Sequence, residues 1–509
     1  MVHNDYLHTD GRLIRFAHCY LIEPDSGNLS TCTASLWVDK LLGTIARVVM
    51  EDTSVVNCFV SESGQDPSIG EEALDAAPTI DLQGQVLAPG LIDIQINGAY
   101  GIDFSHWPGE EEDYVSKVET VSTRLAETGV TAYLPTVISQ TPDMYEQIIP
   151  ALHNHAVDSL TTGAAVIGYH LEGPFLAPSK IGCHPAENAR DASEGWRSFV
   201  GTYGQTIIEP AEEFKLAKII TLAPEVLGIM DCIPRLVEEG YTVSIGHSGA
   251  NTQQAAQAVT SGASLITHLF NAMPAFHHRE PGIIGLLGAA PGCHENGDGK
   301  HPSQTLQSAL PTPVASQVLG KIERLGGVES PLPSMETKPS ESNNQNSRPF
   351  QRPFWSCIAD GLHVHPFAVN LAYRTHPEGC VLVTDAVSWM DPNLPDGVYP
   401  WRSQDHTVTK KGDSITLTDT DTLAGAAVPL DKCVRNLAKF CGIPLSKAIH
   451  CASRNPAKCL GGSVVKSKGA LKVGFDADLT VWDKETGELL SAWRAGRQVF
   501  GKLELRNPT

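Results

Sequence analysis

The stretch YTVSIGHSGANTQQAAQAVTSGASLITHLFN, residues 241–271, contains a complete strand–helix–strand unit. Its first and last parts, 241–248 and 264–271, are short β-branched and apolar runs that end in polar residues. Such runs are typical of strands that are buried on both faces of a parallel sheet. The middle part, 252–261, has the apolar spacing of a helix. The unit therefore predicts a strand, a crossover helix and a second, parallel strand.

The same alternation continues from residue 86 to residue 386. The strand-like runs are Val86–Asn97, Thr131–Ser139, Ala165–Gly173, Lys218–Glu225, Tyr241–Ser248, Ser264–Asn271, Trp355–His363 and Cys380–Ala386. Helical patterns such as 114–127, 226–239 and 366–373 lie between them. Strand–helix repeats of this number predict a (β/α)8 TIM-like barrel. An open doubly wound sheet is the alternative, but no GxGxxG follows the first run, which argues against dinucleotide binding.

The two ends of the chain differ from this middle part. Residues 11–85 and 470–505 carry short strand-like segments that polar loops separate. We expect them to form one small β-sandwich domain, residues 1–86 and 459–509, beside a barrel of residues 87–458. Segment 291–352 is rich in Pro, Ser, Asn, Gln and Gly, and it is predicted to be a disordered insertion. An active-site lid or a regulatory arm is the alternative for this segment.

Composition restricts the partners and the compartment. Apolar residues make up 41% and charged residues 19% of the 509, which is typical of a globular protein. The net charge of −21 disfavours nucleic acid and anionic membranes, and a site for an anionic substrate must supply its own cations. The 12 cysteines form no CxxC pair, and MVHNDYLHTDGRLIRF at the N-terminus has no apolar signal segment. We expect a cytoplasmic protein with free thiols and with no nucleic-acid or membrane partner.

Polar side chains end most of the predicted strands and are the candidates for the chemistry. In a (β/α)8 barrel, the carboxyl ends of all strands meet at the face that carries the active site. The side chains that reach this face are Gln95, Asn97, His170, Glu172, His247, His268, Asn271, Asp360, His363 and Asp385. A single histidine at a strand end is usually structural. Several of them at one rim, together with carboxylates, favour a metal site.

Glu172, His247 and His268 come from three different runs and form a ligand set that suits a divalent ion, with Zn²⁺ favoured. Three protein ligands leave a coordination position for water, so we predict one such ion per subunit. Asp385 is predicted to carry the proton in a hydrolysis, and binding of a second ion is its alternative role. Gln95 and Asn97 stand where a two-metal site needs histidines. Because amides are poor ligands for such metals, one ion and a free aspartate are favoured.

Longer motifs resemble the N-acetylglucosamine-6-phosphate deacetylase family of the amidohydrolase superfamily. They are LAPGLIDIQINGAYGIDF from Leu87, HLEGPF from His170, GHSGA from Gly246, THLFNAMPAFHHREPG from Thr267, IADGLHV from Ile358, LVTDA from Leu382 and LAGAAVPL from Leu423. The resemblance extends over nearly the whole chain except the polar insertions. It implies the same metal ligands and a catalytic Asp385.

The resemblance also implies the reaction and its substrate contacts. The reaction is hydrolysis of N-acetyl-D-glucosamine 6-phosphate to D-glucosamine 6-phosphate and acetate in amino-sugar catabolism, in which a metal-activated water attacks the amide carbonyl. His184 and His363 would contact the sugar and help to polarise the carbonyl. Asn271, Ala272 and Arg279 would hold the phosphate, with Arg279 reaching the neighbouring subunit's site in a homodimer. The other implied contacts are Cys183, Asp360, Gly361, Leu362, Leu423, Ala424 and Gly425.

Two alternatives remain open on the sequence. The first is an amidohydrolase that acts on cyclic amides, like dihydroorotase or hydantoinase, which usually has His-x-His on its first strand and a bridging modified lysine. The second is a non-catalytic amidohydrolase-like scaffold, which typically loses metal ligands. Metal content separates the three, because we expect about one ion per chain for the deacetylase, about two for a cyclic amidase and none for a scaffold.

Overall fold

The structure is a computed structural model that describes residues 12–52, 54, 59, 69–158, 163–209, 216–289, 350–400, 407–419 and 423–503. Residues 291–349 of the predicted insertion lie outside the described residues. Its last three residues are described: Phe350 is buried, and the Arg352 guanidinium donates to the backbone carbonyls of Leu287 and Thr375. Among the described helices, none combines the length and the apolar character needed to cross a bilayer.

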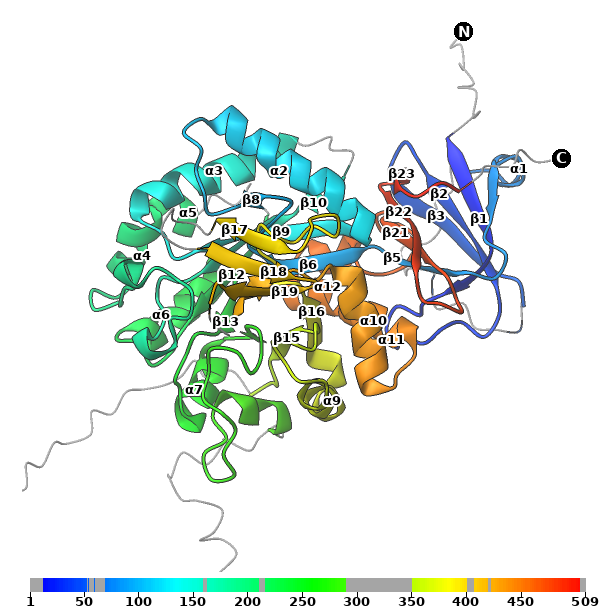
Figure 1. The fold of residues 1–509 in the computed structure, drawn as a ribbon. Helices are drawn as coiled ribbons and strands as arrows, with labels where there is room; N and C mark the ends of the chain where they lie inside the picture. Colours follow the sequence, from blue (N-terminus) through cyan, green and yellow to red (C-terminus); the bar gives the residue numbers. More distant parts are fainter. Residues whose placement is uncertain are drawn as a thin grey trace, which may run out of the picture.

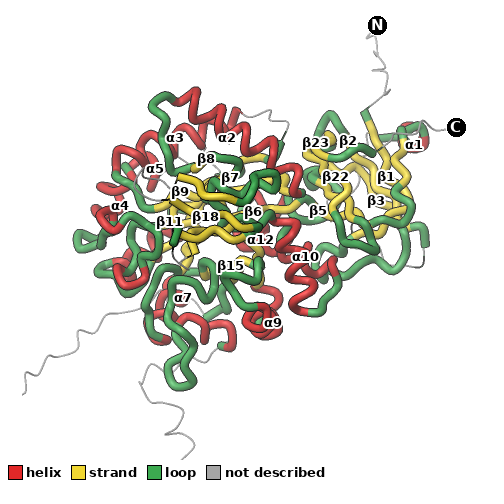
Figure 2. Tube along the Cα trace, viewed as in Figure 1, coloured by secondary structure: helices red, strands yellow, loops and turns green. Residues whose placement is uncertain are grey.

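The middle of the chain forms the predicted (β/α)8 barrel, with helices around a central ring of parallel strands (Figures 1 and 2). Its strands, in barrel order, are β6 (Leu91–Ile96), β9 (Val130–Ile138), β11 (Gly168–Glu172), β12 (Ala217–Leu222), β13 (Tyr241–Ile245), β14 (Leu265–Ile266), β15 (Phe354–Ile358) and β16 (Cys380–Val383), and β10 (Ala165–Val166) also pairs with β9. Every residue of β9 and β11 is buried, as a strand between the barrel core and the helix layer must be. The predicted fold class is confirmed.

Helices cover the outside of the barrel and follow the strands in the expected alternation. They are α2 (Glu111–Leu125), α3 (Pro142–Asp158), α4 (Trp196–Tyr203), α5 (Gln205–Ile208), α6 (Ile229–Glu238), α7 (Thr252–Ser261), α9 (Pro366–Thr375), α10 (Leu430–Cys441), α11 (Leu445–Cys451), α12 (Arg454–Leu460) and α13 (Val464–Ser467). Short 3₁₀ turns lie at η1 (Ala126–Thr128), η2 (Pro178–Lys180), η3 (Ala186–Asn188), η4 (Ile283–Gly288) and η6 (Pro377–Gly379). Helix α7 starts with a complete capping box between Asn251 and Gln254.

Strands from both ends of the chain form a separate β-sandwich beside the barrel (Figure 1). They are β1 (Leu13–Leu21), β2 (Ala34–Asp39), β3 (Thr44–Met50), β4 (Thr79–Asp81), β5 (Val86–Pro89), β21 (Leu479–Trp482), β22 (Leu489–Arg494) and β23 (Arg497–Phe500), and helix α1 (Glu71–Asp75) lies against β1. Phe16 and Trp493, from opposite ends of the chain, pack edge to face with ring centroids 5.1 Å apart in its core. Both ends are therefore needed to complete this core.

The prediction of one strand over Val86–Asn97 is wrong. The run is divided at Gly90 into β5, which pairs with β1 and β21, and β6, which pairs with β9 in the barrel. Gly90 sits against the barrel so closely that an added Cβ would lie 2.1 Å from Thr131 Oγ1. We propose the two expected domains, 1–86 with 459–509 and 87–458, with one change of boundary. Because β5 pairs with β1 and β21, we assign all of Val86–Pro89 to the first domain.

A small antiparallel sheet lies beside the carboxyl ends of the barrel strands. It consists of β17 (Gly397–Pro400), β18 (Thr407–Lys411), β19 (Ser414–Leu417) and β20 (Leu423–Ala426). A bridge between Ala386 and Ala426 joins it to the chain directly after Asp385. The hairpin of β7 (Gly98–Ala99) and β8 (Ile102–Asp103) follows β6 at the same end. Both additions therefore surround the face where the predicted site residues lie.

A buried carboxylate connects β6 to the end of β16, the first and last strands of the barrel. Asp93 Oδ2 accepts from Thr384 Oγ1 at 2.6 Å, and Asp93 Oδ1 accepts from the backbone N–H groups of Gln95 and Thr384 at 3.3 Å each. The N–H of Asp385 donates to the Gln95 carbonyl at 2.9 Å. This set of bonds fixes the backbone that carries both Gln95 and Asp385.

Asp93 is expected to make stability depend on pH. Complete burial raises its pKa to about 7, although the three hydrogen bonds act in the opposite direction. In an unfolded chain the pKa of an aspartate is about 3.9, so between about pH 4 and pH 7 the folded state holds a proton that the unfolded state releases. The free energy of unfolding should therefore fall as the pH rises through this window, by at most about 1.4 kcal/mol per pH unit.

The Asp93→Asn variant cannot ionise and should show a smaller decrease. Urea unfolding of the wild type and the variant at several pH values between 4 and 7 measures the difference. The exposed Asp113→Asn variant is the control and should keep the wild-type dependence. Equal pH dependence in Asp93→Asn and wild type would contradict the assignment.

Candidate metal and catalytic site

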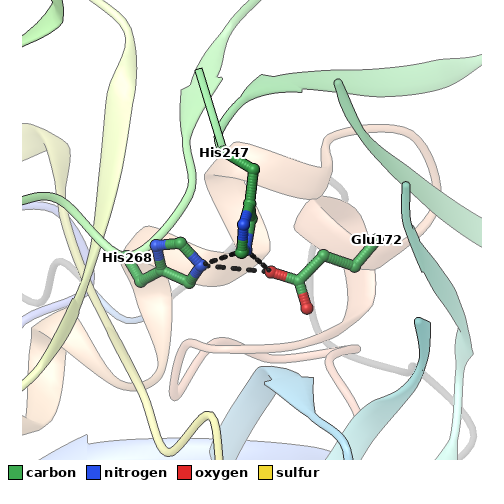
Figure 3. A group of neighbouring side chains, drawn as sticks. All are labelled: Glu172, His247 and His268. Atoms are coloured by element: carbon green, nitrogen blue, oxygen red, sulfur yellow. Dashed lines mark hydrogen bonds and ion pairs between the residues drawn. The ribbon is translucent and has the colours of Figure 1, made fainter. Parts of the chain in front are cut away.

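Glu172, His247 and His268 converge at the carboxyl ends of β11, β13 and β14 (Figure 3). The Glu172 Oε1 atom lies 3.1 Å from His268 Nε2 and 3.3 Å from His247 Nε2, and the two Nε2 atoms are 3.1 Å apart. All three side chains are almost completely buried. Residues far apart in the chain thus present three electron-pair donors to one point.

The hydrogen bonding around these side chains fits a bound cation. His247 Nδ1 lies 2.8 Å from the Lys180 carbonyl oxygen, which can only accept, so Nδ1 carries the proton. In the neutral ring His247 Nε2 is then a lone-pair donor that faces an ionised carboxylate. Two acceptors at this distance repel each other unless a proton or a metal ion lies between them. The chemistry of the donor set and its orientation by the Lys180 carbonyl both suit a divalent metal ion.

The backbone at these strand ends adopts a conformation that is uncommon for residues other than glycine. The φ angles are 48° at His247, 30° at His268 and 48° at Asp385. Such left-handed conformations cost energy and persist where the surrounding structure enforces them, often at functional sites. Here they occur at two of the candidate ligands and at the candidate proton carrier.

Asp385 lies next to this ligand set and is held by two amides. Its Oδ1 accepts from Asn97 Nδ2 at 2.7 Å and from Gln95 Nε2 at 3.4 Å. The same Gln95 nitrogen donates to Glu172 Oε1 at 3.0 Å. One NH₂ group therefore donates to both carboxylates, that of the candidate metal ligand Glu172 and that of the candidate proton carrier Asp385.

Charges around the site shift the pKa values in opposite directions. Burial and the nearby Glu172 carboxylate raise the pKa of Asp385 to about 6. Burial alone would also raise the pKa of Glu172, but hydrogen bonds from His247 and His268 lower it well below its usual range. Glu172 is therefore the more acidic of the two carboxyl groups, and the raised pKa of Asp385 is compatible with its predicted role as proton carrier.

Two further histidines border the site. The His184 ring lies edge-on to the His247 ring with centroids 4.5 Å apart, and its Nδ1 atom is 3.0 Å from Ser139 Oγ. His363 Nδ1 is 2.6 Å from Asp360 Oδ2, a contact that fixes its ring orientation. Both rings thus have a partner on the side away from the cavity.

A cavity of about 250 Å³ opens above the ligand set. The residues from the sequence prediction that line it are Asn97, Glu172, Cys183, His184, His247, His268, Asn271, Ala272, His363, Asp385, Leu423, Ala424 and Gly425. Gln95 does not line this cavity, but it donates hydrogen bonds to Glu172 and Asp385, which do. The structure thus brings most of the predicted residues to one hollow.

Four predicted substrate residues do not line this cavity. Asp360 accepts hydrogen bonds from the backbone N–H groups of Leu362 and His363, so it supports the His363 loop from behind. Gly361 and Leu362 also lie outside the lining, and Leu362 is exposed. Arg279 is exposed on the loop after β14. The reason for Asp360 is that its carboxylate is used inside the turn, and of the residues 360–363 only His363 reaches the cavity lining.

The sequence analysis missed three apolar residues that line the cavity: Ile138, Ile358 and Val387. Ile138 and Ile358 are the last residues of β9 and β15, whereas Val387 lies in the loop after β16; the sequence prediction at these strand ends rested only on titratable and amide side chains. The parallel pairing of β9 with β11 places Ile138 opposite Glu172. That register, which the sequence does not show, was the missing signal.

Comparison with known proteins identifies the class and then the family. The Amidohydrolase family model matches residues 86–500, so the chain belongs to the amidohydrolases. It is 35% identical over 424 residues to N-acetylglucosamine-6-phosphate deacetylase of Danio rerio, covering 83% of this chain and 86% of that protein. The human protein of the same name is also 35% identical, with 84% and 89% coverage. The chain belongs to the N-acetylglucosamine-6-phosphate deacetylase family.

Solved structures agree on the fold. The crystal structure of N-acetylglucosamine-6-phosphate deacetylase from Pasteurella multocida is similar to this chain with a TM-score of 0.67 and 24% identity. The match covers 97% of this chain and all of that one. It supports the barrel with its terminal β-sandwich.

The ligand set can be tested by metal content. The wild-type protein should bind about one divalent ion per chain, and His268→Ala should retain less than about a tenth of it, because two ligands remain at a site that needs three. Inductively coupled plasma mass spectrometry of dialysed protein measures this. His365→Ala, at the exposed start of α9, is the control and should keep the wild-type content. Full metal occupancy in His268→Ala would refute the site.

Proposed function

We propose that this protein hydrolyses N-acetyl-D-glucosamine 6-phosphate to D-glucosamine 6-phosphate and acetate. One observation carries the proposal: a single amide, Gln95 Nε2, contacts both Glu172 of the ligand set and Asp385. Metal-assisted hydrolysis of an amide bond needs a metal site and a group that transfers protons in the same cavity, and the candidate ligands and Asp385 would supply both. Membership of the deacetylase family supports the choice of substrate.

Glu172, His247 and His268 would hold the metal ion, and we propose Zn²⁺ because imidazole and carboxylate suit it and three protein ligands are typical of its catalytic sites. When bound, such an ion polarises a carbonyl oxygen and lowers the pKa of water. Gln95 keeps the Glu172 carboxylate in place through its hydrogen bond. The ligand orientation thus depends on this chain's own hydrogen bonds.

Asp385 would act first as general base and then as general acid. Its carboxylate takes the proton of the attacking water, and the protonated group then gives it to the amine that leaves. A pKa raised to about 6 suits both roles, because neither protonation state is costly near neutral pH. Asn97 and Gln95 donate to Oδ1, which leaves the other carboxylate oxygen for the proton.

We assign the remaining contacts by their place around the cavity. His184, beside the ligand set, would help to polarise the amide carbonyl, and His363 would contact the sugar. Asn271 and Ala272, after β14, would hold the phosphate. Because the protein is strongly acidic, the phosphate needs a local cation, and a guanidinium can give it two parallel hydrogen bonds.

We propose that Arg279 supplies this cation to the neighbouring subunit of a homodimer. It does not line the cavity of its own chain and is exposed. Large apolar side chains are exposed close to Arg279 in the sequence, in the loop after β15 and on α9: Phe276 58%, Leu362 47%, Phe367 80% and Leu371 69%. Such residues are typical of a protein–protein contact when they form one patch.

Two further aspects belong to the proposal. Buried cysteines such as Cys19, Cys357 and Cys433 are free thiols, which supports a reducing compartment, and we propose the cytoplasm. Gln95 and Asn97 donate to carboxylates where a two-metal cyclic amidase would need imidazole ligands, which favours the deacetylase over that class.

Acetate release tests the reaction and the role of Asp385. The wild type should release acetate from N-acetylglucosamine 6-phosphate, and Asp385→Asn should lower kcat by at least about 10³-fold, because the amide cannot accept the proton of water. Metal content should stay at the wild-type level in the variant. Near-normal turnover by Asp385→Asn, or no turnover by the metal-loaded wild type, would refute the proposal.

Subunit mixing tests the role of Arg279. Arg279→Ala should raise KM for the phosphorylated sugar, and its activity should approach that on the unphosphorylated sugar. If Arg279 serves the neighbouring subunit's site, a one-to-one mixture of Arg279→Ala and Asp385→Asn, after exchange, should regain about a quarter of wild-type activity, since half of the dimers contain one complete site. No recovery in a mixture that exchanges subunits would contradict the arrangement.

A further inference from the structure

Ile138 is part of the wall between the catalytic cavity and a second cavity. The second cavity, of about 490 Å³, lies beside the first at the carboxyl end of the barrel. Ile138 lines both hollows, whereas Ile358 lines only the catalytic one and Met144 only the outer one. A single side chain therefore contributes to both spaces.

The position of Ile138 is rigid. Its Cα pairs with that of Glu172 across β9 and β11, so both side chains point to the same face of the sheet. Ser105 Oγ accepts from the Ile138 N–H at 3.0 Å, and the Tyr145 hydroxyl donates to the Ile138 carbonyl at 3.2 Å. The side chain is 4% exposed. These contacts hold the Ile138 backbone in place beside the candidate metal ligand Glu172.

In the substrate placement proposed above, the acyl end faces this wall. In the barrel order, β9 lies diametrically opposite β14, after which Asn271 and Ala272 follow. With the phosphate near those residues, the amide lies between them and β9. Because a secondary amide is planar and trans, its acyl methyl group points away from the sugar carbon on the nitrogen. The methyl group is thereby directed toward Ile138.

The outer cavity has the character of an acyl-chain pocket. Its lining includes the large side chains of Trp107, Tyr114, Met144 and Trp389, and its polar members are Asp103, Ser105, His106, Lys117, Gln140 and Ser388. Aromatic and thioether side chains favour apolar ligand groups, and the volume far exceeds that of an acetyl group. Space for a longer acyl chain therefore exists directly behind Ile138.

We propose that Ile138 is the residue that limits the substrate to a short acyl group, and that the outer cavity would take the chain of a longer N-acyl substituent once this wall is shortened. The inference rests on the proposed deacetylase function. It assigns acyl-group specificity to an apolar side chain, which makes no polar contact with the candidate metal ligands or with Asp385.

The test compares kcat/KM for glucosamine 6-phosphate carrying N-acetyl, N-butanoyl or N-hexanoyl groups. The wild type should prefer acetyl by at least about tenfold over hexanoyl, because one methylene in a fitted pocket changes kcat/KM by about tenfold or more. In Ile138→Ala the hexanoyl-to-acetyl ratio should rise at least about tenfold, since the chain gains apolar contacts in the outer cavity. If the alanine variant does not fold, Ile138→Val is the milder substitution, and it should raise the ratio of kcat/KM for the N-propanoyl substrate to that for the N-acetyl substrate.

Two controls separate a specific effect from a general one. Ile358→Ala enlarges the catalytic cavity away from the wall, and Met144→Ala enlarges only the outer cavity; neither should change the acyl ratio more than about twofold. A metal-loaded Ile138→Ala with the wild-type ratio, or a wild type that hydrolyses hexanoyl as well as acetyl, overturns the inference. Absence of acetyl hydrolysis in the wild type would instead overturn the proposed function, and this inference with it.

Discussion

Three electron-pair donors forced to within 3.3 Å of one another are the constraint on which the site depends. Two imidazoles and a carboxylate arrive from three strands of one parallel barrel, and the barrel geometry leaves them no room to separate. The Lys180 carbonyl selects the tautomer of His247, and left-handed backbone at His247 and His268 aims the rings. This arrangement suits a divalent cation at its centre.

The second constraint is that two carboxylates lie close together in a buried space. Glu172 and Asp385 would repel each other, and Gln95 relieves this by donating to both. Asn97 adds a bond to Asp385, and Asp93 holds the strand that carries the amides against Thr384. Two neutral amides thus donate hydrogen bonds to this pair of carboxylates. The result is an ionised Glu172 beside an Asp385 with a raised pKa.

Much of this arrangement could be predicted from the sequence because barrel strands end at a common face. Glu172, His247, His268 and Asp385 each end or follow an apolar run, so their convergence follows from the repeat pattern. The division of 86–97 at Gly90 could not be predicted, because an apolar run looks the same whether it stays in one sheet or passes between two. Ile138 was missed since its role depends on strand register, and Asp360 turned out to support a loop because side-chain direction in a tight turn is set by local hydrogen bonds.

The pairing of β5 with β21 has a consequence for synthesis of the chain. Residues 86–89 and 479–482 are neighbours in one sheet although nearly four hundred residues separate them. While a ribosome is still making the barrel, β5 therefore has an open edge on the side that β21 will occupy, directly before the first barrel strand. The nascent β-sandwich cannot complete this sheet until the last part of the message has been translated.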